Sequence, residues 1–511
     1  MVDLNATPEQ LRQAYEGLQA EIVRLHVVIK LKDEQIRLLN IEKWGPQADK
    51  LSPDQLALLP QELVVRAAEV EREATLPEAQ KQLPKARQPR PNHPGRAELP
   101  SHLERREVII PCAPGECHCA KCGAERPVIG YEIREELDCV PAQFFVNVIK
   151  REKRGSHCWP EQGVTVAPAP PQIVPKSKLS NNVIVEAIAA KFQQHTPLYR
   201  LCALLEENYG LELSRQTLNQ AILRAADLLT AVGRAMASEL LRGDYIQADE
   251  TTLPCQKPEK TGRNHRAFLW EFSRPGGNVV FQFDMGRARA GPKAFLQGFQ
   301  GILQCDGYAA YNDLGEGITY LACMAHIRRG FIEAAQLAPE DPLPPELVRE
   351  FARLYQIERA AKEKNLTAPE RREVRQSQGK PIMQSLQERL IEVRQQALLG
   401  SKLAKACDYA LGQWPRMELY LEHGRVEIDN NWCEGAMRPI ALGRKNWLHV
   451  GDQSAGPKIA AIASIVETCR RLDIPLRAYL SDILPKLGEG PVSRVVELTP
   501  ARWKAARTQA S

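Results

Sequence analysis

The 511-residue sequence has no uninterrupted apolar stretch of about 18 residues, the length that a membrane-spanning helix requires. Its opening residues, MVDLNATPEQ, lack the basic segment and following apolar stretch of a secretory signal. We therefore expect a cytoplasmic protein with no membrane contact. In that compartment the 13 cysteines are better interpreted as thiols or metal ligands than as disulfides.

The sequence also lacks a strong charge of either sign and any internal repeat. Its formal net charge is +5, an excess that permits nucleic-acid binding without requiring it. Hydrophobic residues make up 43% and charged residues 26%, which is typical of a globular chain rather than a disordered one. The length is sufficient for several domains.

Residues 1–45 are predicted to form a helix with an apolar seam. Pro8 suits its first turn, and Gly45-Pro46 ends it. A seam of this period favours a coiled coil and hence a homo-oligomer, whereas an amphipathic helix packed on its own chain is the alternative. The seam residues, four and three apart with polar Lys32 among them, are Leu11, Tyr15, Leu18, Ile22, Leu25, Ile29, Ile36 and Leu39.

Three further segments precede the central part of the chain. Residues 46–100 carry prolines and basic residues without an apolar face, which indicates a linker. Residues 101–168 indicate a small β unit around a cysteine cluster, with a β-like stretch at Phe144–Lys150. Residues 180–242 are helical, and Ser214 is a predicted N-cap after a turn. Their spacing fits a helix-turn-helix that enters a major groove, or an ordinary helical hairpin.

From residue 244 the sequence changes to a β pattern. DYIQADE, RAFLWEFSR and NVVFQFDM are three consecutive predicted strands, and GILQCDG and TYLACM are two more. Strand–helix alternation after a meander predicts a mixed α/β sheet covered by helices over residues 244–450. A charged helical insertion is expected at about 340–415, and a helical C-terminal tail at 451–511.

Three acidic residues are the candidate catalytic groups. Asp249 and Asp306 are predicted to end the first and fourth strands, so neighbouring strands would place both at one edge of the sheet. Glu434 falls in the first turns of a helix that begins near Asp429. Three carboxylates can hold Mg²⁺ or Mn²⁺, the ions that phosphodiester cleavage uses. An Asp at a strand end often only forms a turn, and Glu250, a rival acid, would face the other side of the sheet.

Basic residues near these acids are candidate contacts to DNA phosphates, which would set position rather than sequence. A solvated helix end is the alternative for each of them. His326 begins a helix and is interpreted as a structural hydrogen-bonding residue rather than a catalyst. The candidate DNA-binding residues are Arg328, Arg329, Arg438, Arg444 and Lys445.

The cysteine cluster is a candidate zinc site. Cys119 and Cys122 form a C-x-x-C pair, which grips one side of a tetrahedral zinc ion. Cys158 and Cys117 are the other candidate ligands, and His157 could replace the fourth. A degenerate finger that folds without metal is the alternative.

The segments ADETT, QCDGYAAY, CMAHIRRGF and DNNWCEGAMRPIALGRKNWL resemble the catalytic core of the insertion-sequence-66 family of bacterial transposases. The likeness covers nearly the whole chain and implies an RNase H-like fold, with Asp249, Asp306 and Glu434 as the acids of a DDE motif. Two positions depart from the family's pattern. Gly435 stands where an arginine usually follows the third acid, and Glu161 replaces the second cysteine of a second C-x-x-C.

The resemblance implies a transposase that binds the terminal inverted repeats of an insertion sequence and catalyses metal-dependent strand cleavage and transfer. Its partners would be double-stranded DNA, from element ends and target, and accessory proteins of the same element. In the family the zinc-binding unit is taken to bind the element's ends. Two alternatives remain open: a catalytically inactive DNA-binding remnant, and an RNase H-like nuclease or resolvase without strand transfer.

Overall fold

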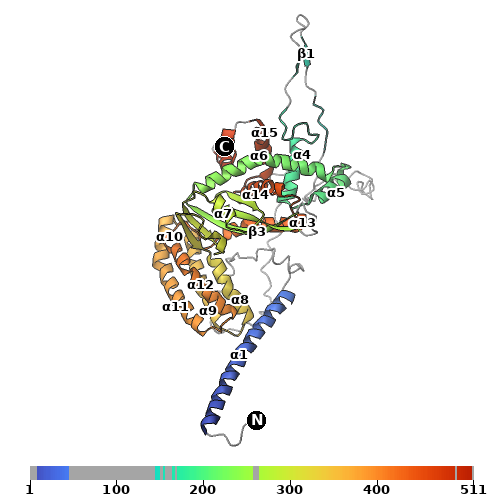
Figure 1. Ribbon diagram of the computed structural model, residues 1–511. Helices are drawn as coiled ribbons and strands as arrows, with labels where there is room; N and C mark the ends of the chain where they lie inside the picture. The colour runs from blue at the N-terminus through green and yellow to red at the C-terminus, as the bar shows by residue number, and fades with distance from the viewer. Residues whose placement is uncertain are drawn as a thin grey trace, which may run out of the picture. The chain divides into compact units, whose positions relative to one another are not determined.

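A computed structural model describes residues 8–44, 144–149, 153–155, 164–166, 170–256, 264–489 and 492–508 (Figure 1). The chain divides into two compact units, residues 77–167 and the remainder. In the smaller unit, β1 (Lys153–Gly155) pairs antiparallel with β2 (Val164–Val166). The strand expected at Phe144–Lys150 is wrong for residues 144–149, which are exposed and have no strand conformation.

The N-terminal helix α1 spans Pro8–Trp44, the bounds that its proline and the following glycine predict. Seam side chains such as Leu18, Ile22 and Ile29 are more than half exposed. An apolar row of this kind, left uncovered on a single chain, is suited to a partner helix. No helix in the described ranges is both long and apolar enough to cross a bilayer.

A five-stranded sheet of order β5-β4-β3-β6-β7 forms the centre of the larger unit. β3, β4 and β5 are an antiparallel meander, while β6 and β7 run parallel to β3. The mixed sheet that the β pattern predicts is therefore present. Its strands are β3 (Tyr245–Cys255), β4 (His265–Ser273), β5 (Val279–Asp284), β6 (Gly301–Cys305) and β7 (Ile318–Ala322).

Side chains of the two central strands alternate between two hydrophobic clusters. Ile246 and Leu303 belong to the larger cluster, and their neighbours Tyr245 and Ile302 to the smaller one. Since successive side chains of a strand point to opposite faces, each cluster covers one face of β3 and β6. Residues two apart on these strands therefore share a face.

The larger cluster joins the sheet to helices that precede it in the sequence and to helices that follow it. Ser214 caps α6 by accepting a hydrogen bond from the Thr217 N–H, which confirms the predicted N-cap. The helical stretch 180–242 thus shares a core with the sheet, and Figure 1 shows α6 and α14 lying over it. These helices are α4 (Asn181–Ile188), α5 (Leu198–Tyr209), α6 (Arg215–Leu241), α14 (Gly456–Arg471) and α15 (Leu476–Glu489).

Helix α14 also protects the edge strand β5. The hydroxyl oxygens of Ser464 and Thr468 accept hydrogen bonds of 2.8 and 2.9 Å from the backbone N–H groups of Phe281 and Val279. Unpaired edge groups are otherwise a template for pairing with another chain. The segment expected to be a C-terminal tail thus contributes its first helix to the core, and α16 (Pro500–Thr508) follows later.

The smaller cluster is built from β6, β7 and a group of helices. In the sequence these helices lie between β7 and α13 (Asn431–Trp447). The last four of these helices occupy the stretch, about 340–415, where the sequence predicts a charged insertion, and all five lie together on one side in Figure 1. They are α8 (Met324–Leu337), α9 (Leu343–Glu363), α10 (Ala368–Val374), α11 (Lys380–Gln396) and α12 (Lys402–Glu418).

A buried ion pair ties this helical group to the segment that leads into α13. Arg375 is 1% exposed, and its Nε and Nη2 donate to the two carboxylate oxygens of Glu358 at 2.7 Å. The same guanidinium donates to the carbonyl oxygens of Tyr420, His423 and Val426. Arg371 adds ion pairs to Glu358 and Glu427, so two arginines hold the backbone just before α13.

We predict that Glu358→Gln lowers the free energy of unfolding by about 3–5 kcal/mol, because it leaves the Arg375 charge buried without its partner. Glu350→Gln is the matched control on the same helix, since Glu350 pairs with Arg353 at a more exposed position. The control should cost less than about 1 kcal/mol. Urea denaturation measures both, and equal losses would contradict the assignment.

Candidate active site

The register of β3 and β6 places Asp249 beside Asp306. Gln247 pairs with Gln304, 57 residues later, and Asp249 and Asp306 are separated by the same offset. Continuing the register by two residues therefore sets the two aspartates side by side on neighbouring strands, whose backbones lie about 4.8 Å apart. Residues paired in a parallel ladder point to the same face, so both carboxylates share the face of the two glutamines.

Asp306 directly follows β6, as predicted, but Asp249 does not end its strand. It is an interior residue of β3, which continues to Cys255 because β4 pairs with it along that length. Only the parallel partner β6 ends at Cys305. The expected strand end is thus wrong for Asp249. This residue lies at an edge only because the neighbouring strand β6 ends before it.

A buried network of polar side chains lies one step below the aspartates. The Gln247 amide donates to the Gln304 carbonyl oxygen at 2.9 Å and to the Tyr245 hydroxyl oxygen at 2.8 Å. The Tyr245 hydroxyl donates to the same Gln304 oxygen at 2.5 Å. All three side chains are buried, so these bonds are shielded from water and hold β3 and β6 in register.

The same network anchors the start of α13. The Gln247 amide also donates to the Asp429 carbonyl oxygen at 2.9 Å, and its own oxygen accepts from the Cys433 N–H at 3.2 Å. The Asn430 amide donates to the Ala248 carbonyl oxygen at 3.2 Å. The first turn of α13, which carries Glu434, is therefore bonded directly to the strand that carries Asp249.

Electrostatics show that the three acids and Glu250 lie within range of one another. Burial raises the pKa of Asp249 well above its ordinary value, and the charges of Glu250, Glu434 and Asp306 raise it further. Like charges this close favour protonation of some members or capture of a cation.

Glu434 has the clearest shift of the group. Burial raises its pKa to about 8, with further contributions from Asp429 and Asp306. Arg329 and Arg438 oppose this rise without cancelling it. A glutamate that holds its proton near neutrality would lose that proton to solvent when a cation binds at the same place.

Glu250 has hydrogen-bond and ion-pair partners of its own. Its carboxylate accepts a 2.7 Å hydrogen bond from the Tyr311 hydroxyl and forms an ion pair with Arg287. Arg287 in turn lies over the Tyr308 ring, 3.8 Å from its centroid. These contacts support the ranking of Glu250 below Asp249 as a metal ligand.

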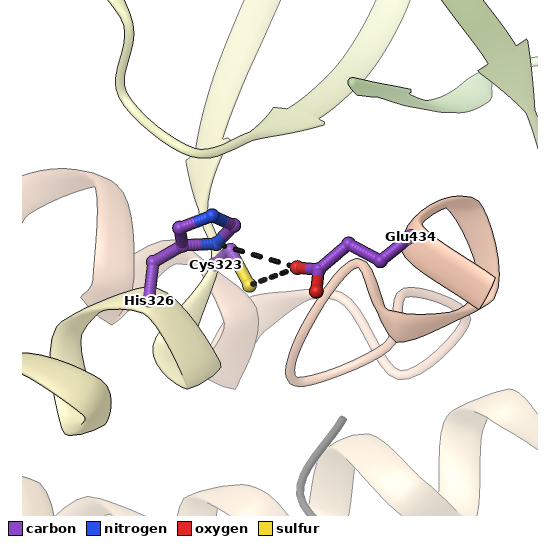
Figure 2. A group of neighbouring side chains, drawn as sticks. All are labelled: Cys323, His326 and Glu434. Atoms are coloured by element: carbon purple, nitrogen blue, oxygen red, sulfur yellow. Dashed lines mark hydrogen bonds and ion pairs between the residues drawn. The ribbon is translucent and has the colours of Figure 1, made fainter. Parts of the chain in front are cut away.

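Cys323 and His326 face Glu434 from the start of α8 (Figure 2). His326 Nδ1 lies 3.4 Å and Cys323 Sγ 3.9 Å from Glu434 Oε1. Burial lowers the pKa of His326 to about 4. The sequence prediction named His326 only as a structural residue and missed Cys323. The signal was the C-x-x-H spacing, which puts both side chains in one helical turn beside a strand end.

The five predicted DNA-contacting residues differ in their exposure to solvent. Arg438 and Lys445 are exposed, and Arg329 is half-buried. Arg328 and Arg444 are only 2% and 5% exposed, which disfavours their predicted contact with DNA phosphates. Arg444 donates to the Thr251 and Thr252 hydroxyl oxygens and to the Thr252 carbonyl oxygen, because α13 brings it against β3.

Gly435 lies against an arginine from another helix. A Cβ atom at this position would be 2.5 Å from Arg471 Nη2. Arg471 donates to the Trp432 carbonyl oxygen at 2.7 Å and to Glu467, and it stacks 4.6 Å from the Trp432 ring centroid. A guanidinium from α14 thus lies beside the residue that follows Glu434.

The candidate zinc ligands Cys117, Cys119, Cys122 and Cys158 lie outside the described residues.

Comparison with known families gives three matches. Residues 176–458 match the model described as "Transposase IS66 family". Residues 116–158 match "zinc-finger binding domain of transposase IS66", and this range includes all four candidate zinc ligands. Residues 33–108 match "Transposase C of IS166 homeodomain".

Similar proteins occur in Sinorhizobium fredii. The uncharacterized protein y4hP is 31% identical, over 81% of this chain and 78% of its own length. The uncharacterized proteins y4jD and y4qI are 31% and 32% identical, over 80% and 81% of this chain and 82% and 78% of theirs.

The glutamine network generates a first prediction for this site. Gln247→Leu should lower the free energy of unfolding by about 1–3 kcal/mol, because it strips partners from buried polar groups. Amide hydrogen exchange should quicken in the first turn of α13. Gln282→Leu is the control, since Gln282 is exposed on β5. Unchanged exchange around Cys433 in the Gln247 variant would show that the network does not hold α13.

A second prediction concerns pH. The folded protein keeps the Glu434 proton up to about pH 8, whereas the unfolded chain releases it near the ordinary value of 4.5. Without added divalent ions, this group therefore makes stability fall as the pH rises through that window. Glu434→Gln should flatten the fall, and the exposed-site control Glu388→Gln should not. Urea unfolding between about pH 5 and pH 8 measures the slope, and a wild-type slope in Glu434→Gln would contradict the shift.

Proposed function

Because this chain belongs to the transposase IS66 family, we propose that it is a DDE-type transposase that binds the terminal inverted repeats of an insertion sequence and catalyses metal-dependent DNA strand cleavage and strand transfer. The supporting observation is the convergence of Asp249, Asp306 and Glu434 from a strand, a strand end and a helix start. The strand order, a meander followed by two parallel strands, supports an RNase H-like arrangement for this core.

The residues fit a pair of hard divalent cations, Mg²⁺ or Mn²⁺. These ions prefer oxygen ligands, and a bound cation relieves both the burial of the Asp249 charge and the repulsion from neighbouring carboxylates, which together raise its pKa. Asp249, Asp306 and Glu434 would hold the ions. When bound, such ions supply Lewis acidity for attack on a phosphodiester and for departure of the leaving oxygen.

The chain's own residues would prepare this chemistry. Glu434 and Asp249 give up protons when the ions bind, so binding strengthens as the pH rises towards 8. Arg329, Arg438 and Lys445 would contact DNA phosphates and set the position of the scissile bond. Arg444 would act from the interior, by holding α13 against β3.

Binding of the element's ends is assigned to the segment that matches the zinc-finger model. Its match supports Zn²⁺ bound by Cys117, Cys119, Cys122 and Cys158. Double-stranded DNA at the element ends and at the target would be the partner, together with accessory proteins of the same element. A catalytically inactive remnant is the alternative, because Gly435 stands where the family usually has an arginine. The guanidinium of Arg471 lies beside Gly435 and could take the place of that arginine, which weakens this alternative.

The exposed seam of α1 supports self-association through this helix. Leu18, Ile22 and Ile29 are each more than half exposed, which a second copy of the helix would cover.

For catalysis, we predict that Asp249→Asn reduces cleavage to background but leaves binding of element ends intact, because the amide keeps the shape and loses the charge that holds metal. The assay uses a duplex carrying the element's end, with Mg²⁺ for cleavage and a gel shift for binding. Asp313→Asn is the control, at a side chain that is 86% exposed. Wild-type cleavage by Asp249→Asn would rule out this site.

For assembly, we predict that Ile22→Lys lowers the mass of the protein in solution to that of one chain, 57.3 kDa, because a charge enters the seam. Ala20→Lys adds the same charge off the seam and should leave the oligomer intact. Light scattering after size-exclusion chromatography measures both. A wild-type protein that is already monomeric would contradict the proposal.

A further inference from the structure

Three side chains of different chemistry converge at the start of two helices. Cys323 Sγ, His326 Nδ1 and Glu434 Oε1 all lie within 4.8 Å of one another. Cys323 is the N-cap residue of α8, His326 lies in its first turn, and Glu434 lies in the first turn of α13. Figure 2 shows the imidazole, the thiol and the carboxylate pointing toward a common point.

The separations of these atoms fit the edges of a tetrahedral zinc site. With ordinary zinc–ligand lengths, a tetrahedral N···O edge is about 3.4 Å and an S···O edge about 3.6 Å. The structure has 3.4 Å between His326 Nδ1 and Glu434 Oε1, and 3.9 Å between Cys323 Sγ and the same oxygen. The Cys323 and His326 ligand atoms lie within 4.8 Å of each other, so the two side chains would close toward a bound ion to complete the three-ligand geometry, which leaves a fourth position for water.

Two further observations point to a ligand at this place. His326 Nδ1 is buried and makes no hydrogen bond of good geometry, since its contact with Glu434 Oε1 is long at 3.4 Å; this is uncommon for a buried polar atom. The Asn430 N–H donates to Cys323 Sγ at 3.4 Å, which offsets part of the rise that burial and the Glu434 charge cause in the pKa of this thiol. Cys323 and Glu434 are 1% and 5% exposed, so their donor atoms are shielded from competing water.

We propose that Cys323, His326 and Glu434 form a second metal site, selective for a borderline-soft divalent cation of the zinc class. Thiolate and imidazole ligands suit zinc and are poor ligands for magnesium. The site is thus distinct from the carboxylate cluster in two of its three ligands and shares only Glu434.

The shared carboxylate makes the second site inhibitory. A zinc ion held by Glu434 Oε1 draws that carboxylate toward α8 and away from Asp249 and Asp306. Zinc therefore competes with magnesium for a ligand rather than for the same position. This consequence rests on the proposed strand cleavage, whereas zinc binding itself does not.

Zinc content of the purified full-length chain tests the binding. After equilibration with Zn²⁺ and removal of free metal, elemental analysis should find one zinc per chain fewer in Cys323→Ser and in His326→Ala than in the wild type. The zinc-finger segment is untouched in both variants and supplies a constant background. Cys202→Ser and His423→Ala, at partly buried positions elsewhere, are the matched controls and should keep the wild-type content.

Circular dichroism verifies that each variant is folded, and His326→Ala decides the result if Cys323→Ser is not. Equal zinc content in His326→Ala and the wild type would overturn the site. It would mean that His326 and Glu434 are joined only by a proton and not by a metal ion. This count needs no activity, so it remains decisive even if the chain cleaves no DNA and the proposed function fails.

Inhibition tests the competition. In Mg²⁺-dependent cleavage, each protein's rate is divided by its own zinc-free rate. The zinc concentration that halves this relative rate should be at least about tenfold higher for His326→Ala than for the wild type. The wild type and His423→Ala should be equally sensitive to zinc. Equal sensitivity of His326→Ala and the wild type would show that zinc acts elsewhere.

Discussion

Two buried glutamines join the three chain segments from which the acidic cluster is assembled. Gln247 and Gln304 hydrogen-bond to each other across β3 and β6, and each lies two residues before an aspartate on the same face. Gln247 also bonds to the backbone on both sides of the α13 start. The spacing between the aspartates and Glu434 is therefore set by a buried network with little freedom to rearrange. Water cannot replace its bonds, which makes each unpaired group costly.

This rigidity has an electrostatic cost that indicates the site's purpose. Holding carboxylates together in a poorly hydrated place raises the pKa of Asp249 and of Glu434. A fold selected for stability alone would avoid such repulsion, so a site of this kind favours a functional explanation. The helical group between β7 and α13 contributes from a distance, because Arg375 holds the segment just before Asp429.

Local sequence patterns were sufficient for much of this architecture. Alternating apolar residues predicted β3 to β7, and Ser214 predicted the start of α6. The residues before Glu434 predicted that this glutamate lies in the first turns of a helix. Interactions between distant segments were not predictable. Arg444 has the same local sequence whether it faces solvent or Thr252, and only the docking of α13 on β3 buries it. Cys323 likewise gains its significance when α13 brings Glu434 across, from 111 residues away. Asp249 was expected at a strand end because its antiparallel partner β4 could not be registered from sequence.

The central claim is that Asp249, Asp306 and Glu434 grip the same divalent ions. Anomalous diffraction from crystals of the protein soaked in Mn²⁺ tests it most directly, because it locates the ion without reference to activity. The account predicts manganese within about 2.0–2.3 Å of a carboxylate oxygen from each of the three residues. Manganese held by the aspartates and Glu250, with Glu434 left on Cys323 and His326, would contradict it.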